Sequence, residues 1–237
     1  MPDLPQREIL PSAQLDAAWL PTRDRLAQED REEGLRIRVH RSLRALSQAE
    51  EIEAGSDSSS ALDAAFVFRW VALNALYGQW DDERGMAMKD RVALDRFTSQ
   101  ARLVDTSDRL VSALETVSDD ARTLLESPFL IERFWRDQEW DQVRPARGRA
   151  AKFRGEIREE RQGAALHRLL IAVYFLRCQI VHGGATLGSN MNRVTVEPGS
   201  RILAVLCGQL IALVVEHGLE MEWGEICYPP VRERTEG

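Results

Sequence analysis

The sequence has few lysines, few cysteines and no long uninterrupted apolar run. Lysine occurs only at Lys89 and Lys152, so nearly every cation is an arginine. The three cysteines, Cys178, Cys207 and Cys227, are odd in number and widely spaced, which indicates packing residues in a reducing compartment rather than a disulfide framework. No apolar run reaches the ~18 residues of a membrane span, and the N-terminus lacks the features of a secretory signal. We therefore expect a cytoplasmic protein without membrane contact.

Motifs for metals and cofactors are also missing from the sequence. No set of cysteines and histidines has the spacing of zinc ligands, and there is neither a phosphate-loop motif nor a GxGxxG motif. We expect no metal and no cofactor. A net charge of -7 argues against coating of duplex nucleic acid by bulk electrostatics, although a local basic groove remains compatible with it.

The chain does contain apolar residues that recur with the spacing of an α-helix. With 237 residues, 44% of them hydrophobic and 29% charged, it can bury a globular core. Residues 61–78 and 163–182 are apolar on most sides, which predicts two core helices, and residues 199–217 predict a third partner. No set of alternating strands is convincing. The pattern predicts an all-α bundle with two long apolar core helices and additional amphipathic helices.

The remaining segments predict the amphipathic helices and the connections. Pro21 is expected to end the first helix, the serine-rich loop 55–60 to cap the helix that follows it, and Pro198 to lie in the first turn of the last helix, after a loop over 183–196. The tail 223–230 is expected to pack back onto the bundle. We divide the chain into an N-terminal helical extension of unknown role, residues 1–55, and a main helical domain, residues 56–237. The predicted amphipathic helices span residues 12–20, 29–54, 84–103, 107–125, 129–140 and 144–161.

The strongest candidate for chemistry is a pair of residues at the end of the second core helix. Arg177 and His182 stand five apart, immediately before Gly183 and Gly184. We expect Gly183 to adopt the left-handed conformation that ends a helix. A histidine can move a proton near neutral pH, and a guanidinium can hold a phosphate and balance its charge. The alternative is structural: an arginine that caps carbonyls and a histidine that finishes a helix.

The sequence around this pair resembles a known family. Residues 169–184, with the sequence LLIAVYFLRCQIVHGG, look like the signature helix of HEPN (higher eukaryotes and prokaryotes nucleotide-binding) domains. Two further segments are similar to the bacterial Apea-like branch of that family: FRWVALNALY at 68–77, and Asn192-Arg193 followed by GSRIL at 199–203, with a closing Trp-Gly at 223–224 and Tyr-Pro at 228–229. The resemblance covers about residues 60–230.

This resemblance implies an activity. Many HEPN proteins are all-α, metal-independent endoribonucleases in which two copies form one composite cleft, and they act in toxin–antitoxin pairs or in anti-phage defence. It implies that Arg177 and His182 are the catalytic pair, that RNA is the substrate, and that the chain is a homodimer with a possible antitoxin or defence-system partner protein. The sequence departs from the family at Cys178, where active members commonly carry asparagine. That departure motivates a second hypothesis, a catalytically inactive module that binds nucleotides or proteins; a third is a purely structural helical protein.

Three further residues could support such a site. Asn74 and Tyr77 lie on one face of the first core helix, where Asn74 could orient His182 or contact substrate, or could simply bond a neighbouring helix. Arg193 could bind phosphate or form an ion pair that tethers a loop. The charged stretch 144–161 is a solvated helix face or an RNA track, and its purely basic first half, 144–149, is the better RNA candidate.

Overall fold

The computed structural model describes residues 9–137, 143–184, 188 and 193–228. It confirms the all-α class: helices make up nearly all of the described elements, and the strands form a single two-residue pair. The elements, in chain order, are α1 (Ser12–Gln28), α2 (Glu33–Gly55), α3 (Ser59–Tyr77), β1 (Trp80–Asp81), β2 (Met86–Ala87), α4 (Asp90–Val104), α5 (Arg109–Thr116), α6 (Ser118–Glu126), the 3-10 turn η1 (Pro128–Leu130), α7 (Glu132–Arg136), α8 (Val143–Arg158), α9 (Gln162–Val181) and α10 (Arg193–His217).

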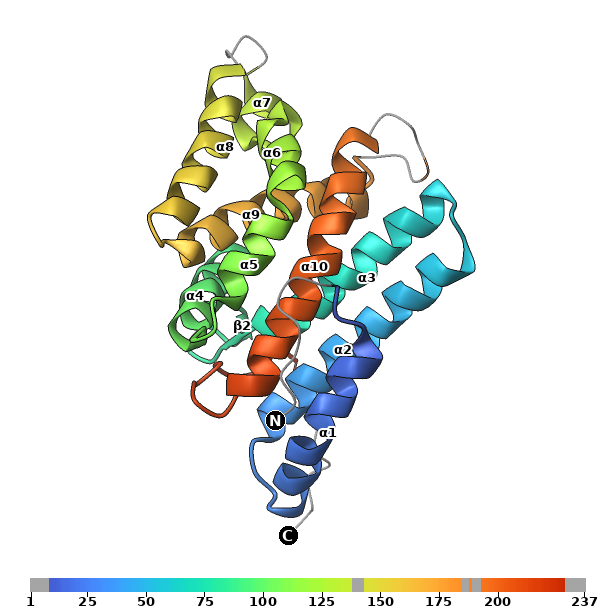
Figure 1. The fold of residues 1–237 in the computed structure, drawn as a ribbon, viewed down its shortest axis with the longest axis vertical. Coiled ribbons are helices and arrows are strands. Elements are labelled where there is room, and N and C mark those ends of the chain that lie inside the picture. Colours follow the sequence, from blue (N-terminus) through green and yellow to red (C-terminus); the bar gives the residue numbers. More distant parts are fainter. Residues whose placement is uncertain (1–8, 138–142, 185–187, 189–192, 229–237) are drawn as a thin grey trace.

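Helix α10 is the centre of the bundle. It runs through the middle of the molecule, with α1 to α3 on one side and α4 to α8 on the other, while α9 passes behind it (Figure 1). It contacts α1 to α6 and α9, so its apolar side chains are buried, apart from Val194 in the first turn, which is 71% exposed. Gly199 allows this closeness, since an added Cβ there would lie 2.6 Å from Leu176 of α9 and 3.3 Å from Phe66 of α3. The helix expected as a third partner is thus the most central one.

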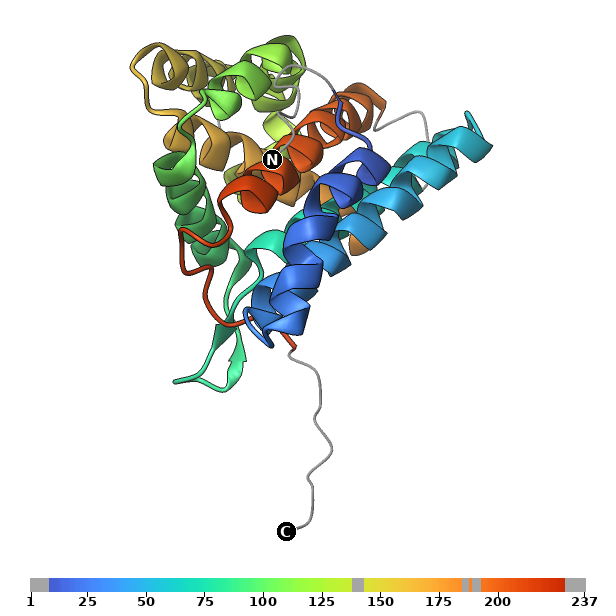
Figure 2. The ribbon, with the colours of Figure 1, turned by 60° about the horizontal axis from the view of Figure 1, so that its bottom comes forward.

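Helices α2 and α3 form an antiparallel pair joined by a short turn, and α1 packs along α2 (Figure 2). The Ser58 hydroxyl accepts a hydrogen bond from the Ala61 N–H at 3.1 Å, which confirms the predicted cap of α3. Leu15 and Trp19 of α1 and Leu43 of α2 belong to the same continuous core as α10. Residues 9–55 therefore share the core of residues 56–228 in this structure.

The tail after α10 packs back onto the bundle, as predicted for its described part. Arg38 of α2, 1% exposed, donates hydrogen bonds to the carbonyls of Gly78 (3.0 Å), Trp223 (3.1 Å) and Gly224 (3.0 Å). Burial lowers the pKa of Arg38 to about 10. The backbones of Gln79 and Ile226 form an isolated antiparallel β-bridge. One buried guanidinium thus joins α2, the end of α3 and the tail.

Several predicted boundaries were wrong. Pro21 does not end the first helix, because α1 continues to Gln28 with Pro21 inside it. The helix predicted over 107–125 is two helices, α5 and α6, which meet at Val117. The start of the predicted helix 84–103 is a hairpin, so α4 begins at Asp90. Its two strands project from the bundle (Figure 2).

The last helix also begins earlier than predicted. Helix α10 starts at Arg193, so Pro198 lies inside it and residues 193–196, expected in the loop, are helical. We expected Pro198 in the first turn, where no ladder bond is lost; at the sixth position of the helix its missing N–H instead leaves the Val194 carbonyl without that bond. The segment predicted as one short helix over 129–140 consists of η1 and α7 as far as Asp137; residues 138–140 lie outside the described part.

Candidate functional site

The candidate site lies on the last turns of α9. The helix ends at Val181, and His182 is its cap residue, with its N–H bonded to the Cys178 carbonyl at 3.0 Å. Gly183 has φ +72, so the predicted left-handed stop is confirmed. A side chain at this position would be strained by the backbone conformation. His182 is exposed as a result of this abrupt end, while Arg177 and Cys178 are half-buried.

Arg177 forms no ion pair with a carboxylate of any described residue. Its only hydrogen bond within the described part of the chain runs from Nη1 to Cys178 Sγ at 3.9 Å. Sulfur is a weak acceptor, so this contact does not neutralise the guanidinium. Its charge is therefore available to an anion that arrives from solvent.

Arg177 and His182 do not bond to each other within the single chain. Residues five apart on an α-helix differ by about 140° around the axis and by about 7.5 Å along it. His182, like Arg177, forms no hydrogen bond with a carboxylate among the residues described. One chain thus presents both groups at one helix end without fixing them against each other.

Asn74 and Tyr77 belong to a partly buried hydrogen-bond network with Asp90. Asn74 Nδ2 donates to Tyr77 Oη at 2.8 Å and to Asp90 Oδ1 at 3.4 Å, and the Tyr77 hydroxyl donates to Asp90 Oδ1 at 3.0 Å. The network ties the end of α3 to the first residue of α4. In the described part of the chain neither Asn74 nor Tyr77 bonds to His182.

The network lies within electrostatic reach of Arg177. Burial raises the pKa of Tyr77 above its usual range and Asp90 acts in the same direction, whereas the positive charge of Arg177 acts in the opposite one. Burial also raises the pKa of Tyr174, with Cys178 beside it adding to the shift. Both phenols therefore remain protonated donors at neutral pH beside the Arg177 end of α9.

Asp90 and Tyr174 were not identified from the sequence as part of this region. Asp90 occupies the first turn of α4, where a carboxylate is favoured by the helix dipole, and that pattern could have revealed a helix start there. Tyr174 is one turn before Cys178 on α9, and its ring lies 6.1 Å from that of Trp70. Its i, i+4 relation to Cys178 was a signal in the sequence that went unused.

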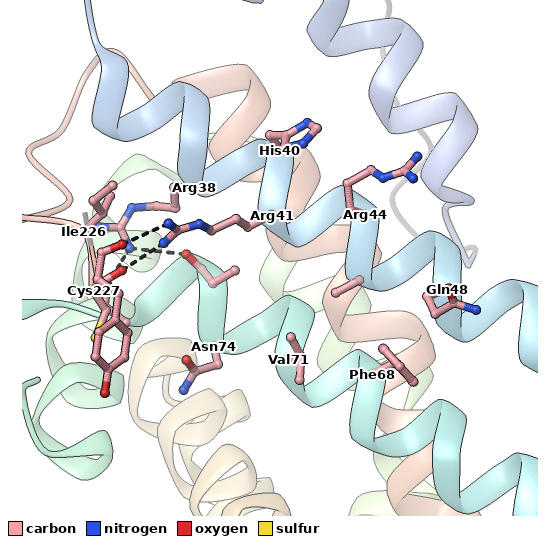
Figure 3. Close-up of a pocket in the computed structure, with 14 residues that line it drawn as sticks. Arg38, His40, Arg41, Arg44, Gln48, Phe68, Val71, Asn74, Ile226 and Cys227 are labelled. Atoms are coloured by element: carbon pink, nitrogen blue, oxygen red, sulfur yellow. Dashed lines mark hydrogen bonds between the residues drawn. The ribbon is translucent and has the colours of Figure 1, made fainter. Parts of the chain in front are cut away.

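A groove opens on the other side of Asn74, between α2, α3 and the tail (Figure 3). It has a volume of about 550 Å³. Arg41 donates to the carbonyls of Cys227 and Tyr228, both at 2.9 Å, while Phe68 and Val71 of α3 are exposed on its wall. Figure 3 shows the side chain of Asn74 pointing away from α2. The groove is thus a surface next to the network, and its floor is mostly apolar.

The other predicted residues have varied surroundings. Arg193 begins α10, but its side chain lies outside the described residues. Cys207 is fully buried, with its thiol donating to the Arg69 carbonyl at 3.3 Å, and burial raises its pKa to about 12. Cys178 and Cys227 are half-buried free thiols. Within the described ranges no three histidine, cysteine or acidic side chains are grouped as metal ligands would be.

Comparison of the chain with known protein families, with curated proteins and with solved structures finds no match. The helices of the structure define the class, which is all-α, and only the site bears on the activity. Two helices, α9 and α10, have the length and composition of a membrane span, and 44% and 94% of these segments, respectively, are buried inside the protein. Burial of that kind is also found in core helices of globular proteins.

Proposed function

We propose that the chain is a metal-independent endoribonuclease of the HEPN type, which acts as a homodimer in cytoplasmic toxin or anti-phage defence. The observation that carries this proposal is the pair at the end of α9: a half-buried Arg177 without a carboxylate partner among the described residues, and an exposed His182 five residues later. A site that must receive a phosphate needs its cation unpaired and its proton carrier accessible.

The chemistry assigned to the pair is transesterification. The 2'-hydroxyl of a ribose attacks the adjacent phosphorus, the O2'–P bond forms, and the P–O5' bond breaks, which leaves a cyclic phosphate and a free 5'-hydroxyl. His182 accepts the proton of the attacking hydroxyl or delivers one to the departing oxygen. Arg177 binds the phosphate and stabilises the charge that develops on it. Since the two groups do not meet in one chain, a second copy would supply the opposing pair.

The test is cleavage of mixed RNAs by the purified chain in EDTA. We expect wild type to produce fragments with cyclic phosphate ends, and His182→Ala and Arg177→Ala to lose at least 100-fold in rate, as when an acid–base group is removed. His217→Ala is a matched control, because His217 also ends a helix but is held by Glu220 at 2.8 Å. Intact RNA at high enzyme concentration, or equal cleavage by wild type and His182→Ala, would refute the assignment.

A second candidate function is a binding module without catalysis. It is favoured by Cys178, whose thiol contacts Arg177 where active family members commonly carry an asparagine. In this case the end of α9 holds a nucleotide or a partner protein. Calorimetry that detects nucleotide binding unchanged in His182→Ala, together with no RNA cleavage, would favour the module over the nuclease.

A further inference from the structure

A second pocket lies along α9 from His167 to Phe175, before the helix end that carries Arg177 and His182. It has a volume of about 590 Å³ and is formed by α4, the segment from η1 to α7, α8 and α9. We call it the α8–α9 pocket. Its lining consists of Arg91, Val92, Asp95, Leu130, Ile131, Glu132, Arg149, His167, Arg168, Ile171 and Phe175.

Three arginines line the pocket, and two of them have partners. Arg168 forms a double hydrogen bond with Glu156, at 2.8 and 2.6 Å. Arg91 lies 3.3 Å from Glu132 and 4.9 Å above the centre of the Phe175 ring. Glu132 also contacts Arg136 at 2.6 Å, so its single charge is shared between two guanidinium groups.

Arg149 is the cation left without a counter-charge. Its one hydrogen bond to a described residue runs to the Leu130 carbonyl at 3.3 Å, and it forms no ion pair with any described carboxylate. Burial lowers the pKa of Arg149 to about 10, and the nearby positive charge of Arg168 acts in the same direction. A guanidinium has five N–H donors in a planar fork, and most of those on Arg149 have no acceptor in the described part of the chain.

His167 adds an unsatisfied group to the same wall. Its Nε2 atom is buried and has no hydrogen-bond partner among the described residues. Buried polar atoms are usually bonded, so this atom, in a residue that lines the same pocket as the uncompensated Arg149, lacks an expected hydrogen-bond partner. A phosphate oxygen would satisfy both Arg149 and His167 Nε2–H. Two carboxylates also line the pocket: that of Asp95, which is exposed, and that of Glu132, which Arg91 and Arg136 share.

The rest of the lining is apolar. Leu130, Ile131 and Ile171 provide a surface on which a planar base can lie, next to the cationic wall. Positions 167, 171, 175, 178 and 182 follow one side of α9 at a spacing of three to four residues, so the pocket and His182 share that side. Phe175 and His182 are separated by about 10 Å along the axis.

We propose that the α8–α9 pocket binds the phosphate group of a nucleotide, either as a free mononucleotide or as one unit of an RNA strand. Arg149 holds the phosphate from one side, His167 donates to it from α9, and the base lies on the apolar floor. Binding in this pocket requires no cleavage at the helix end. Pocket binding can therefore be refuted while the nuclease assignment stands, and the nuclease assignment can be refuted while pocket binding stands.

The test measures binding with the full chain in a His182→Ala background, so that RNA probes stay intact. The probes are AMP, adenosine and a fluorescent single-stranded 12-mer RNA. Arg149→Gln is compared with Arg154→Gln, an exposed arginine of the same helix α8 that does not line the pocket. We expect Arg149→Gln to weaken binding at least tenfold and Arg154→Gln to change it less than twofold.

The probes separate the two sources of phosphate. AMP binding that depends on Arg149, with no matching change for RNA, identifies a free nucleotide, whereas the opposite pattern identifies an RNA strand. If Arg149→Gln does not fold, melting temperatures of the His182→Ala protein replace the binding comparison. The shift with AMP is then compared with that with adenosine, and the shift with the RNA is compared with buffer alone. The proposal is overturned if AMP and adenosine bind equally and RNA binding is unchanged in Arg149→Gln. It is also overturned if neither phosphate-bearing probe shifts the melting temperature.

Discussion

Helices α9 and α10 are similarly apolar and similarly long, yet their surroundings are opposite. The apolar segment of α10 is 94% buried inside the protein, and that of α9 is 44% buried. Helix α10 is buried at every position from Ile202 to Val215, whereas Tyr174, Cys178 and Val181 of α9 remain partly or fully exposed. Composition alone therefore does not decide which apolar helix is the centre of a bundle and which one forms part of its surface.

The polar groups of the two helices differ in the same way. Gln209 and Glu216 of α10 are both held by Arg109, at 2.8 Å each. On α9, Arg177 has no carboxylate partner in the described part of the chain. The polar groups of α10 thus stabilise the fold, and those at the end of α9 are available for binding. Four substitutions can break or sharpen this contrast.

The largest effect is expected from Arg109→Leu. Arg109 is 1% exposed, and its substitution removes the guanidinium that donates to Gln209 and Glu216. Removing one partner of a buried ion pair costs about 3–5 kcal/mol of unfolding free energy. Urea denaturation followed by circular dichroism measures this loss. A loss below about 1 kcal/mol would mean that the polar groups of α10 are not structural.

Next in size is the cavity made by Leu206→Ala in α10. Leu206 is completely buried, so the substitution is expected to cost about 2–5 kcal/mol. Its control is Val181→Ala on α9, where the side chain is 48% exposed and the loss is expected to stay near 0.5 kcal/mol. Equal losses at the two positions would show that α9 is covered in solution, for example by a second copy of the chain.

A pH-dependent effect is expected at the contact between α8 and α9. The hydrogen bonds from Arg168 lower the pKa of Glu156, although its burial acts against them. A carboxyl with a lowered folded pKa stabilises the protein above its unfolded pKa of about 4.3, and this contribution disappears as the pH falls through the folded value. Glu156→Gln is expected to cost about 1.5–3 kcal/mol at pH 7, a difference from wild type that shrinks below pH 4. A difference that is constant from pH 7 to pH 3 would contradict this assignment.

The smallest effect on stability is expected from Arg177→Leu. Because the guanidinium has no carboxylate partner among described residues, its loss is expected to change the unfolding free energy by less than about 1 kcal/mol. The same variant removes the phosphate-binding group of the proposed nuclease. A destabilisation as large as that of Arg109→Leu, with RNA cleavage unaffected, would make Arg177 a structural residue and support the third hypothesis.

Much of the fold was predictable from apolar periodicity. The helices around Leu73, Leu170 and Leu206 were all expected, because their apolar residues recur with helical spacing over many turns. The errors fall where a single residue was given too much weight. Proline was taken to end α1 and to start α10, but tertiary packing kept both helices going through it. The break at Val117 has no glycine or proline to mark it.

The candidate site was predictable only in part. The end of α9 and the left-handed Gly183 follow from local pattern, and the structure has both. The bonds of Asn74 and Tyr77 to Asp90 depend on how α3 meets α4, and a single sequence does not encode that geometry in any spacing. The α8–α9 pocket is formed by four segments that are separate in the sequence. The basic run 144–149 therefore indicated a region, but not that Arg149 is the arginine that lines the pocket.

The buried guanidinium of Arg38 has a consequence for the order of events during protein synthesis. Two of its carbonyl acceptors, on Trp223 and Gly224, lie 185 and 186 residues further along the chain. At about 5–20 residues per second, roughly ten to forty seconds pass between translation of the donor and of these acceptors. Nη1 of Arg38 can bond the Gly78 carbonyl much earlier, but until then Nη2 depends on water, so the contacts of α2 are complete only after the tail has been made. Helix α2 is thus synthesised early, but its last hydrogen bonds form only after α10 and the tail have been made.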